Sequence, residues 1–75
     1  MNPTAFAYLA AGFGSAAVTF SAAFGISKLA SAAISGIARQ PEAAGEIRGT
    51  MIITAAMIEG VALLSVVICL LLGFK

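Results

Sequence analysis

The stretch GTMIITAAMIEGVALLSVVICLLLGF, residues 49–74, decides the class of this protein. A helix needs about 20 mostly apolar residues to cross a bilayer, and this run exceeds that length. Its single charged residue, Glu59, lies inside the run, where water is scarce and an ionised carboxylate is costly. A second apolar window, Ala5 to Ser27, carries no charge. The two windows predict a membrane protein with two spanning helices.

The composition of the whole chain supports this class. Of the 75 residues 61% are hydrophobic and 9% are charged, whereas ordinary globular chains carry about 25% charged residues. A signal peptide fits the first window poorly because the first basic residue, Lys28, follows the apolar run, so we expect both spans in the mature protein. The net charge of +1 argues against a nucleic-acid partner.

The reactive side chains are few. The chain has no histidine and one cysteine, Cys69, so an intrachain disulfide, metal binding and thiol–imidazole chemistry are not expected. Cys69 lies among Leu and Ile near the end of the second span, and we expect it to be a small buried apolar residue. No cofactor is predicted.

Proline sets the place where the chain turns. Pro41 lacks a backbone N–H, and the residue before a proline avoids helical geometry. We expect one helix over about residues 4–38, a polar loop over about residues 39–43, and a second helix over about residues 44–74. The predicted fold class is therefore all-α, a single domain (residues 1–75) that forms a transmembrane hairpin of two antiparallel helices.

The charged residues predict the orientation of this hairpin. Five of the seven lie in or near the loop: Lys28, Arg39, Glu42, Glu46 and Arg48. Basic residues favour the cytoplasmic side of a membrane, so we expect a cytoplasmic loop and both termini outside. We expect the stem of Lys28 to lie along lipid while its ammonium reaches the headgroups. The alternative for Lys28 is a role in binding anionic lipid.

Small residues recur through the first helix. Every fourth residue is small along one row: Ser15, Thr19, Ala23, Ser27, Ser31 and Ser35. A second, adjoining row consists of Ala17, Ser21 and Gly25. Small residues let helices approach closely in lipid, and the spacing matches a packing ridge. A simple hairpin interface needs one such row. Several rows indicate a helix that is packed on both sides, as in a closed ring of identical chains.

Glu59 calls for a functional explanation. Antiparallel helices that meet near Pro41 place Glu59 opposite about residues 23–25, near the middle of both spans. Desolvation disfavours the ionised form of a carboxyl group. A structural ion pair would need Lys28, which is about one turn off this register. We therefore predict that Glu59 is reversibly protonated as part of its function.

The residues around Glu59 favour a proton over a sodium ion as the ligand. A sodium site needs several oxygen ligands, whereas the neighbouring residues are apolar: Ala55, Ala56, Met57, Gly60 and Val61, with Ala23, Gly25 and Ile26 opposite. Ser27 is the one hydroxyl expected nearby. A carboxyl group with few polar neighbours suits a proton.

The chain resembles a known family, the c-subunits of F-type ATP synthases. The resemblance rests on a first helix rich in small residues, on the loop Ala38-Arg39-Gln40-Pro41-Glu42, and on a carboxylate 20 residues after the arginine. The stretch GIARQPEAAGEIRGTM, residues 36–51, is especially similar to bacterial and chloroplast members. The resemblance covers essentially the whole chain.

The resemblance implies a rotor ring of identical hairpins, with the first helices inside and the second helices outside. Glu59 would be the proton-binding carboxylate, served by the a-subunit of the stator through two half-channels and an arginine. The loop residues Arg39, Gln40 and Pro41 would contact the central stalk subunits gamma and epsilon. The family's glycine repeat falls here on four residues: Ser21, Ala23, Gly25 and Ser27. Sodium-coupled members carry Gln in place of Ile26 and Ser-Thr in place of Gly60-Val61.

The predicted function is that of a proton-translocating rotor component in a bacterial plasma membrane, or alternatively a plastid thylakoid membrane. The chain has no phosphate loop, so it is not expected to be an enzyme on its own. Two alternatives remain from the sequence: a sodium-coupled rotor component, and a non-transporting structural or pore-forming hairpin. The expected partners are identical subunits, the stator, the stalk and membrane lipid.

Overall fold

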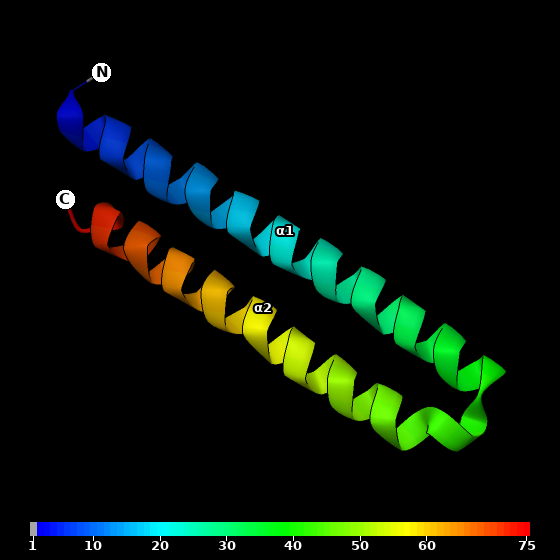
Figure 1. Ribbon diagram of the computed structural model, residues 1–75. Helices are drawn as coiled ribbons and strands as arrows, with labels where there is room; N and C mark the ends of the chain where they lie inside the picture. Colours follow the sequence, from blue (N-terminus) through cyan, green and yellow to red (C-terminus); the bar gives the residue numbers. More distant parts are fainter. Residues whose placement is uncertain (1) are drawn as a thin grey trace.

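The computed structural model describes residues 2–75 and consists of two long antiparallel helices joined by a tight turn (Figure 1). Helix α1 spans Pro3–Arg39, the 3-10 turn η1 spans Pro41–Ala43, and helix α2 spans Ala44–Gly73. The molecule is 58 Å long, and both termini lie at the end opposite the turn (Figure 1). The predicted all-α hairpin is confirmed.

The turn forms where proline ends the first helix. Gln40 leaves helical geometry with φ −134° and ψ 75°, and its N–H donates to the carbonyl oxygen of Gly36 at 2.9 Å. Pro41 then begins a single 3-10 turn, in which the N–H of Ala43 donates to the carbonyl oxygen of Gln40 at 2.9 Å. Arg39, placed in the loop from the sequence, is the last residue of α1. The break in the helix is thus shorter than the expected loop.

The start of α1 is capped by the side chain of Asn2. Its carbonyl oxygen accepts a hydrogen bond from the backbone N–H of Ala5 at 2.7 Å, which satisfies one of the unpaired donors of the first turn. Pro3 occupies the first helical position, where its missing N–H costs nothing.

Three glycines on α1 set the register between the helices. A Cβ atom on each would lie close to one side chain of α2: 2.9 Å from Cys69 Sγ at Gly14, 3.7 Å from Ile58 Cδ1 at Gly25, and 3.2 Å from Ile47 Cδ1 at Gly36. The glycines are eleven residues apart, and so are their partners, in reverse order. Eleven residues make about three turns, so all three contacts lie along one face of each helix.

Most of the apolar surface is exposed in the isolated hairpin. Among residues 2–75 only Ala33 and Cys69 are buried, which confirms the expectation for Cys69. Large side chains such as Phe13 and Phe20 are 75% and 73% exposed. Both helices are long and apolar enough to cross a membrane. Because two helices cannot cover each other's full circumference, lipid or further copies must cover the remaining faces.

The contact between Gly14 and Cys69 gives a direct test of the register. The distance of 2.9 Å between the Gly14 Cβ position and Cys69 Sγ is close to the distance, in a disulfide, between the Cβ atom of one cysteine and the Sγ atom of the other. We therefore predict that Gly14→Cys forms an intrachain disulfide with Cys69 under mild oxidation, detectable as a mass loss of about two hydrogens and by peptide mapping. Gly12→Cys is the matched control, because nothing lies within 4 Å of its Cβ position. Equal cross-linking of both variants would contradict the register.

Candidate functional site

Glu59 lies on α2 directly after a residue that packs against α1. Ile58 contacts Gly25, so Glu59 stands at the level of residues 23–25 of α1, the level expected from the sequence. Glu59 itself is exposed in the isolated hairpin. It is the one ionisable residue of α2 between Arg48 and Cys69. The carboxyl group is thus halfway along the hairpin and outside the contact between its two helices.

The consecutive residues Met57, Ile58 and Glu59 of α2 point in three different directions. Successive residues of an α-helix are turned by about 100°. Ile58 faces α1, so Met57 lies on one flank of the hairpin and Glu59 on the other. We name these the Met57 flank and the Glu59 flank.

A groove of about 630 Å³ runs along the Met57 flank between the two helices. Its walls are mostly apolar and come from both helices: Ala17, Val18, Ser21 and Ala22 of α1, and Thr54, Met57, Ile58, Val61, Ala62 and Ser65 of α2. The α2 residues range from five positions before Glu59 to six positions after it. The groove is therefore level with Glu59 but on the opposite flank.

One hydroxyl in this groove has a fixed orientation. The Thr54 hydroxyl donates a hydrogen bond to the carbonyl oxygen of Thr50 at 2.8 Å. A threonine hydroxyl has one proton and two acceptor lone pairs. Since its proton is engaged within the helix, Thr54 presents acceptor capacity alone to the groove. Thr54 was not singled out from the sequence, because the residue lies five positions from Glu59 and on the other flank.

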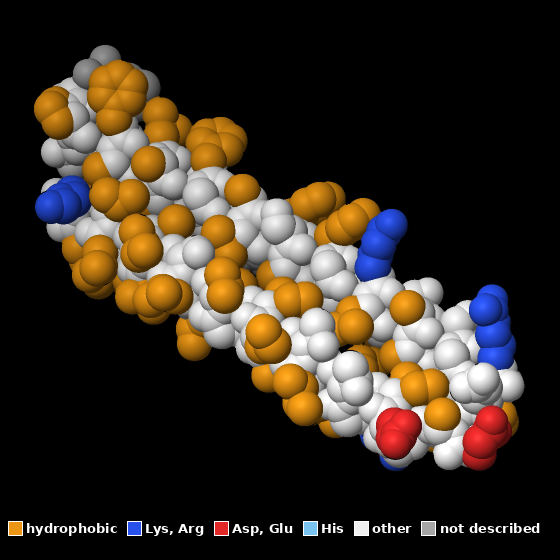
Figure 2. Space-filling view, in the orientation of Figure 1, with side chains coloured by type: hydrophobic (Ala, Val, Ile, Leu, Met, Phe, Trp, Pro, Cys, Tyr) orange, Lys and Arg blue, Asp and Glu red, His pale blue; other side chains and the backbone are white. Residues whose placement is uncertain are grey.

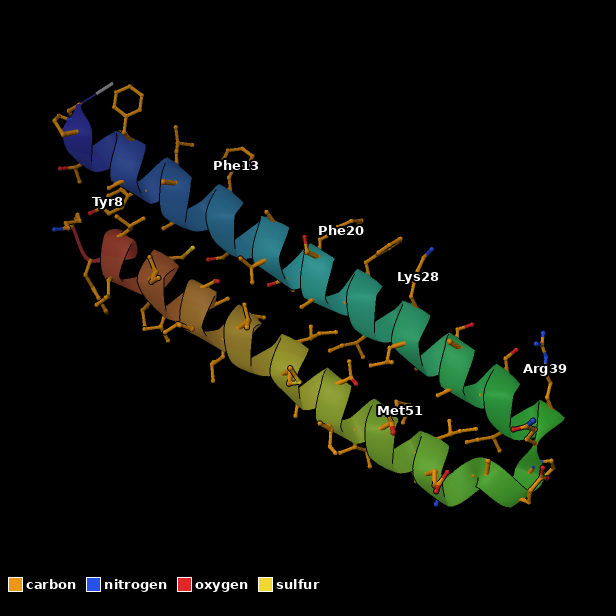
Figure 3. The ribbon with its side chains drawn as sticks, viewed as in Figure 1. Tyr8, Phe13, Phe20, Lys28, Arg39 and Met51 are labelled. Carbon is orange, nitrogen blue, oxygen red and sulfur yellow. The ribbon has the colours of Figure 1, made fainter. Side chains whose placement is uncertain are left out.

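Lys28 does not provide a counter-ion for Glu59 within the hairpin. Its ammonium nitrogen lies over the ring of Phe24, 5.3 Å from the ring centroid. Phe24 also stacks on Phe20, with 6.2 Å between centroids. Figure 3 shows Lys28 and Phe20 pointing away from α2.

The small residues of α1 divide into two groups in the structure. Gly25 lies at the contact with α2, whereas Ser21, Ala23 and Ser27 are exposed. Residues two positions apart lie about 200° apart on a helix, so Ser21 and Ala23 occupy opposite sides of α1. Ser21 lines the groove of the Met57 flank. Both sides of α1 thus offer small residues to neighbouring helices, while the hairpin contact itself uses Gly25.

A stripe of phenylalanines on α1 was not singled out from the sequence. Phe6, Phe13 and Phe20 are seven residues apart, which puts them on one helix face, and all three are exposed. Figure 3 shows Phe13 and Phe20 on the side of α1 that faces away from α2. The period of seven was the available signal, but it is difficult to see among so many other apolar residues.

The loop residues lie at the tip of the hairpin. Arg39, Gln40 and Pro41 are exposed, and Figure 3 shows Arg39 pointing outward from the end of α1. Figure 2 shows acidic and basic side chains together at this end of the molecule, whereas the remaining length is largely apolar and carries isolated basic side chains. The structure therefore separates a tip with charges of both signs from a long, mostly apolar body.

Comparison with known proteins identifies the family. The family pattern of the ATP synthase C-subunit matches residues 5–72. The chain is 54% identical over 66 residues to the ATP synthase c-subunit of Bacteroides thetaiotaomicron, covering 88% of this chain and 78% of the relative. The protein of the same name from Phocaeicola vulgatus is 52% identical over 66 residues, covering 88% and 79%. The chain belongs to the ATP synthase c-subunit family.

A more distant member extends this match along the chain. The ATP synthase c-subunit of Lactobacillus helveticus is 41% identical over 70 residues, covering 93% of this chain and 91% of the relative. Family membership makes the hairpin a membrane protein and a component of the rotor ring of ATP synthase, as the resemblance implied. It favours the rotor over the pore-forming hairpin that the sequence left open.

Proposed function

We propose that this rotor component transports protons, and that Glu59 binds one proton per copy of the ring. The position of Glu59 supports the proposal: a lone carboxyl group inside an apolar span, exposed on a flank of the hairpin. Charged groups inside a membrane are rare and typically mark ion pathways. A protonated Glu59 can travel through lipid as the ring turns, whereas an ionised Glu59 cannot leave a polar partner.

The chemistry around Glu59 supports a proton over a sodium ion. Sodium, like other hard cations, is held by several oxygen ligands. The residues on either side, Ile58 and Gly60, bring no side-chain oxygen, and Ile26 stands where sodium-coupled members carry Gln. The sodium-coupled rotor is thus the second candidate, and it makes a different prediction for labelling experiments.

The proposed partners follow from the two ends and the flanks of the hairpin. The a-subunit of the stator would exchange protons with Glu59 and provide the arginine that attracts its ionised form. The charged tip, with Arg39, Gln40 and Pro41, would contact the stalk subunits gamma and epsilon. We propose that this tip faces the cytoplasm and the termini face outward, in a bacterial plasma membrane, because basic residues favour the cytoplasmic side. The exposed phenylalanines fit contact with lipid.

Rotation then converts proton transfer into mechanical work. A proton that crosses a potential of 100 mV releases about 2.3 kcal/mol. Each copy of Glu59 takes a proton from one side and gives it to the other after travelling around the ring. The stalk sums these small steps, and nucleotide chemistry takes place on other subunits.

Chemical labelling of Glu59 tests the proton assignment. A carbodiimide reacts with protonated carboxyl groups, so we expect rapid modification that maps to Glu59 and slows as the pH rises. Addition of sodium at fixed pH should leave the rate unchanged. Protection by sodium would favour the sodium-coupled rotor, and an unlabelled Glu59 in the intact ring would contradict both rotor assignments.

Replacement of the carboxyl group of Glu59 should abolish proton transport without preventing assembly of the ring. We predict that Glu59→Gln forms rings but lowers proton flux through the reconstituted membrane sector to the background of empty vesicles, because an amide cannot release a proton. Glu46→Gln is the matched control, since Glu46 is an exposed carboxylate in the first turn of α2, and its flux should be normal. Normal flux in Glu59→Gln would refute the assignment.

The exposed small residues of α1 should be needed for assembly of the ring rather than for folding of the hairpin. Ala23 is exposed in the isolated hairpin, so Ala23→Leu should leave the helical hairpin folded but block the approach of the next copy. We expect loss of the assembled ring on native gels with unchanged helix content by circular dichroism. Ala56→Leu is the control, because Ala56 is exposed on the side of α2 turned away from α1. Normal rings from Ala23→Leu would contradict this interface.

A further inference from the structure

The two flanks of the hairpin meet in a ring of identical copies. A closed ring is built from head-to-tail contacts, in which one side of each copy packs against the opposite side of the next. With α1 inside the ring and α2 outside, as the family resemblance implies, the two flanks are the sides turned to neighbouring copies, so the Glu59 flank of one copy would face the Met57 flank of the next. The copies of a membrane ring are related by rotation about an axis perpendicular to the membrane, so equivalent residues lie at the same height. The groove on the Met57 flank of one copy is therefore level with Glu59 of the next. In this arrangement the carboxyl group of one copy would face the groove of the next.

We propose that the Thr54 hydroxyl of the neighbouring copy accepts a hydrogen bond from protonated Glu59. This inference rests on the proposed function of Glu59. The observation that carries it is the bond from the Thr54 hydroxyl to the carbonyl oxygen of Thr50. With its proton engaged there, Thr54 can accept a hydrogen bond from the neutral acid but cannot donate one to the carboxylate. Thr54 is thus selective for the protonated form.

The direction of the glutamate side chain favours Thr54 over the other two hydroxyls of the groove. Side chains on a helix lean toward its N-terminus, so Glu59 leans toward the level of Thr54, which lies about 7.5 Å lower along α2. Ser65 is about 9 Å away in the opposite direction. Ser21 comes from α1 and lies level with about residue 62, also on the far side.

No other charged group competes for Glu59 at this contact. Every residue that lines the groove is apolar or a hydroxyl, so the next copy brings no ionisable side chain to it. On α2 the nearest ionisable residues are Cys69, ten positions away, and Arg48, eleven positions away. On α1 the nearest is Lys28, whose ammonium lies over Phe24 on the face turned away from α2. The hydrogen bond to Thr54 is therefore the specific polar contact of the neutral acid between two copies.

The proposed contact gives each step a simple chemical sequence. In the lipid-facing part of the ring, the Glu59 O–H donates to Thr54 Oγ1 of the next copy, and Thr54 donates to Thr50 within its own helix. At the stator the carboxyl proton passes to water of the exit path, and the hydrogen bond to Thr54 is lost. A new proton from the entry path restores it. The Thr54 proton stays in place throughout.

The test compares the pH dependence of carbodiimide labelling at Glu59 in intact rings of three variants. Thr54→Val keeps the shape but removes the acceptor, so the pH at which labelling falls to half should decrease by about one unit. Thr54→Ser keeps a hydroxyl and should restore the original midpoint. Thr50→Val is the control, because it retains the backbone carbonyl that Thr54 uses and lies outside this groove.

The outcomes separate this proposal from the proposed function. Normal labelling of Glu59 with an unchanged midpoint in Thr54→Val would overturn the role of Thr54 and leave the proton assignment standing. A wild-type ring without labelling at Glu59 would overturn the proton assignment itself. If Thr54→Val does not assemble, the pair Thr54→Ala and Thr54→Ser is compared in the same way, and equal midpoints for this pair would also overturn the proposal.

Discussion

The close approach of the two helices at three glycines is the constraint on which the rest of the structure depends. Because Gly14, Gly25 and Gly36 are spaced by about three whole turns, they hold one face of α1 against one face of α2 over most of the hairpin. This contact fixes the height of α2 and also its rotation. With Ile58 held against Gly25, Glu59 has to lie on a flank. A different rotation of α2 would turn the carboxyl group toward α1 or fully toward lipid.

That rotation also explains why a single hairpin is an incomplete unit. Helices in lipid associate through packing and polar contacts rather than through the hydrophobic effect, so small residues are needed wherever backbones approach. The hairpin contact uses one face of α1, yet Ser21 and Ala23 lie exposed on two other sides. Their proposed packing role requires further copies. In the proposed ring, the same assembly brings the Glu59 flank of one copy to the groove of the next.

The sequence predicted the parts of this arrangement that depend on distance along the chain. Two apolar windows and Pro41 indicated the hairpin, and counting from the turn placed Glu59 at its level. The rotation of the helices could not be predicted, because α2 is apolar on nearly every side and its pattern marks no single face. For the same reason the small residues of α1 could not be divided between the hairpin contact and the outer contacts. The proposed role of Thr54 depends on that rotation, so it could be inferred only from the structure.

If Glu59 carries the transported proton, as proposed, the strength of its contact has to match the driving force of transport. A proton that crosses 100 mV releases about 2.3 kcal/mol, and a site that held its proton much more strongly would stop the ring. A neutral hydrogen bond contributes about 0.5–1.5 kcal/mol, whereas breaking a buried ion pair by removing one partner costs about 3–5 kcal/mol. A groove lined by apolar residues and hydroxyls therefore suits this step better than one that contains a cation. In the proposed mechanism such a groove holds the neutral acid while Glu59 passes through lipid, and it still lets the carboxyl group give up its proton at the stator.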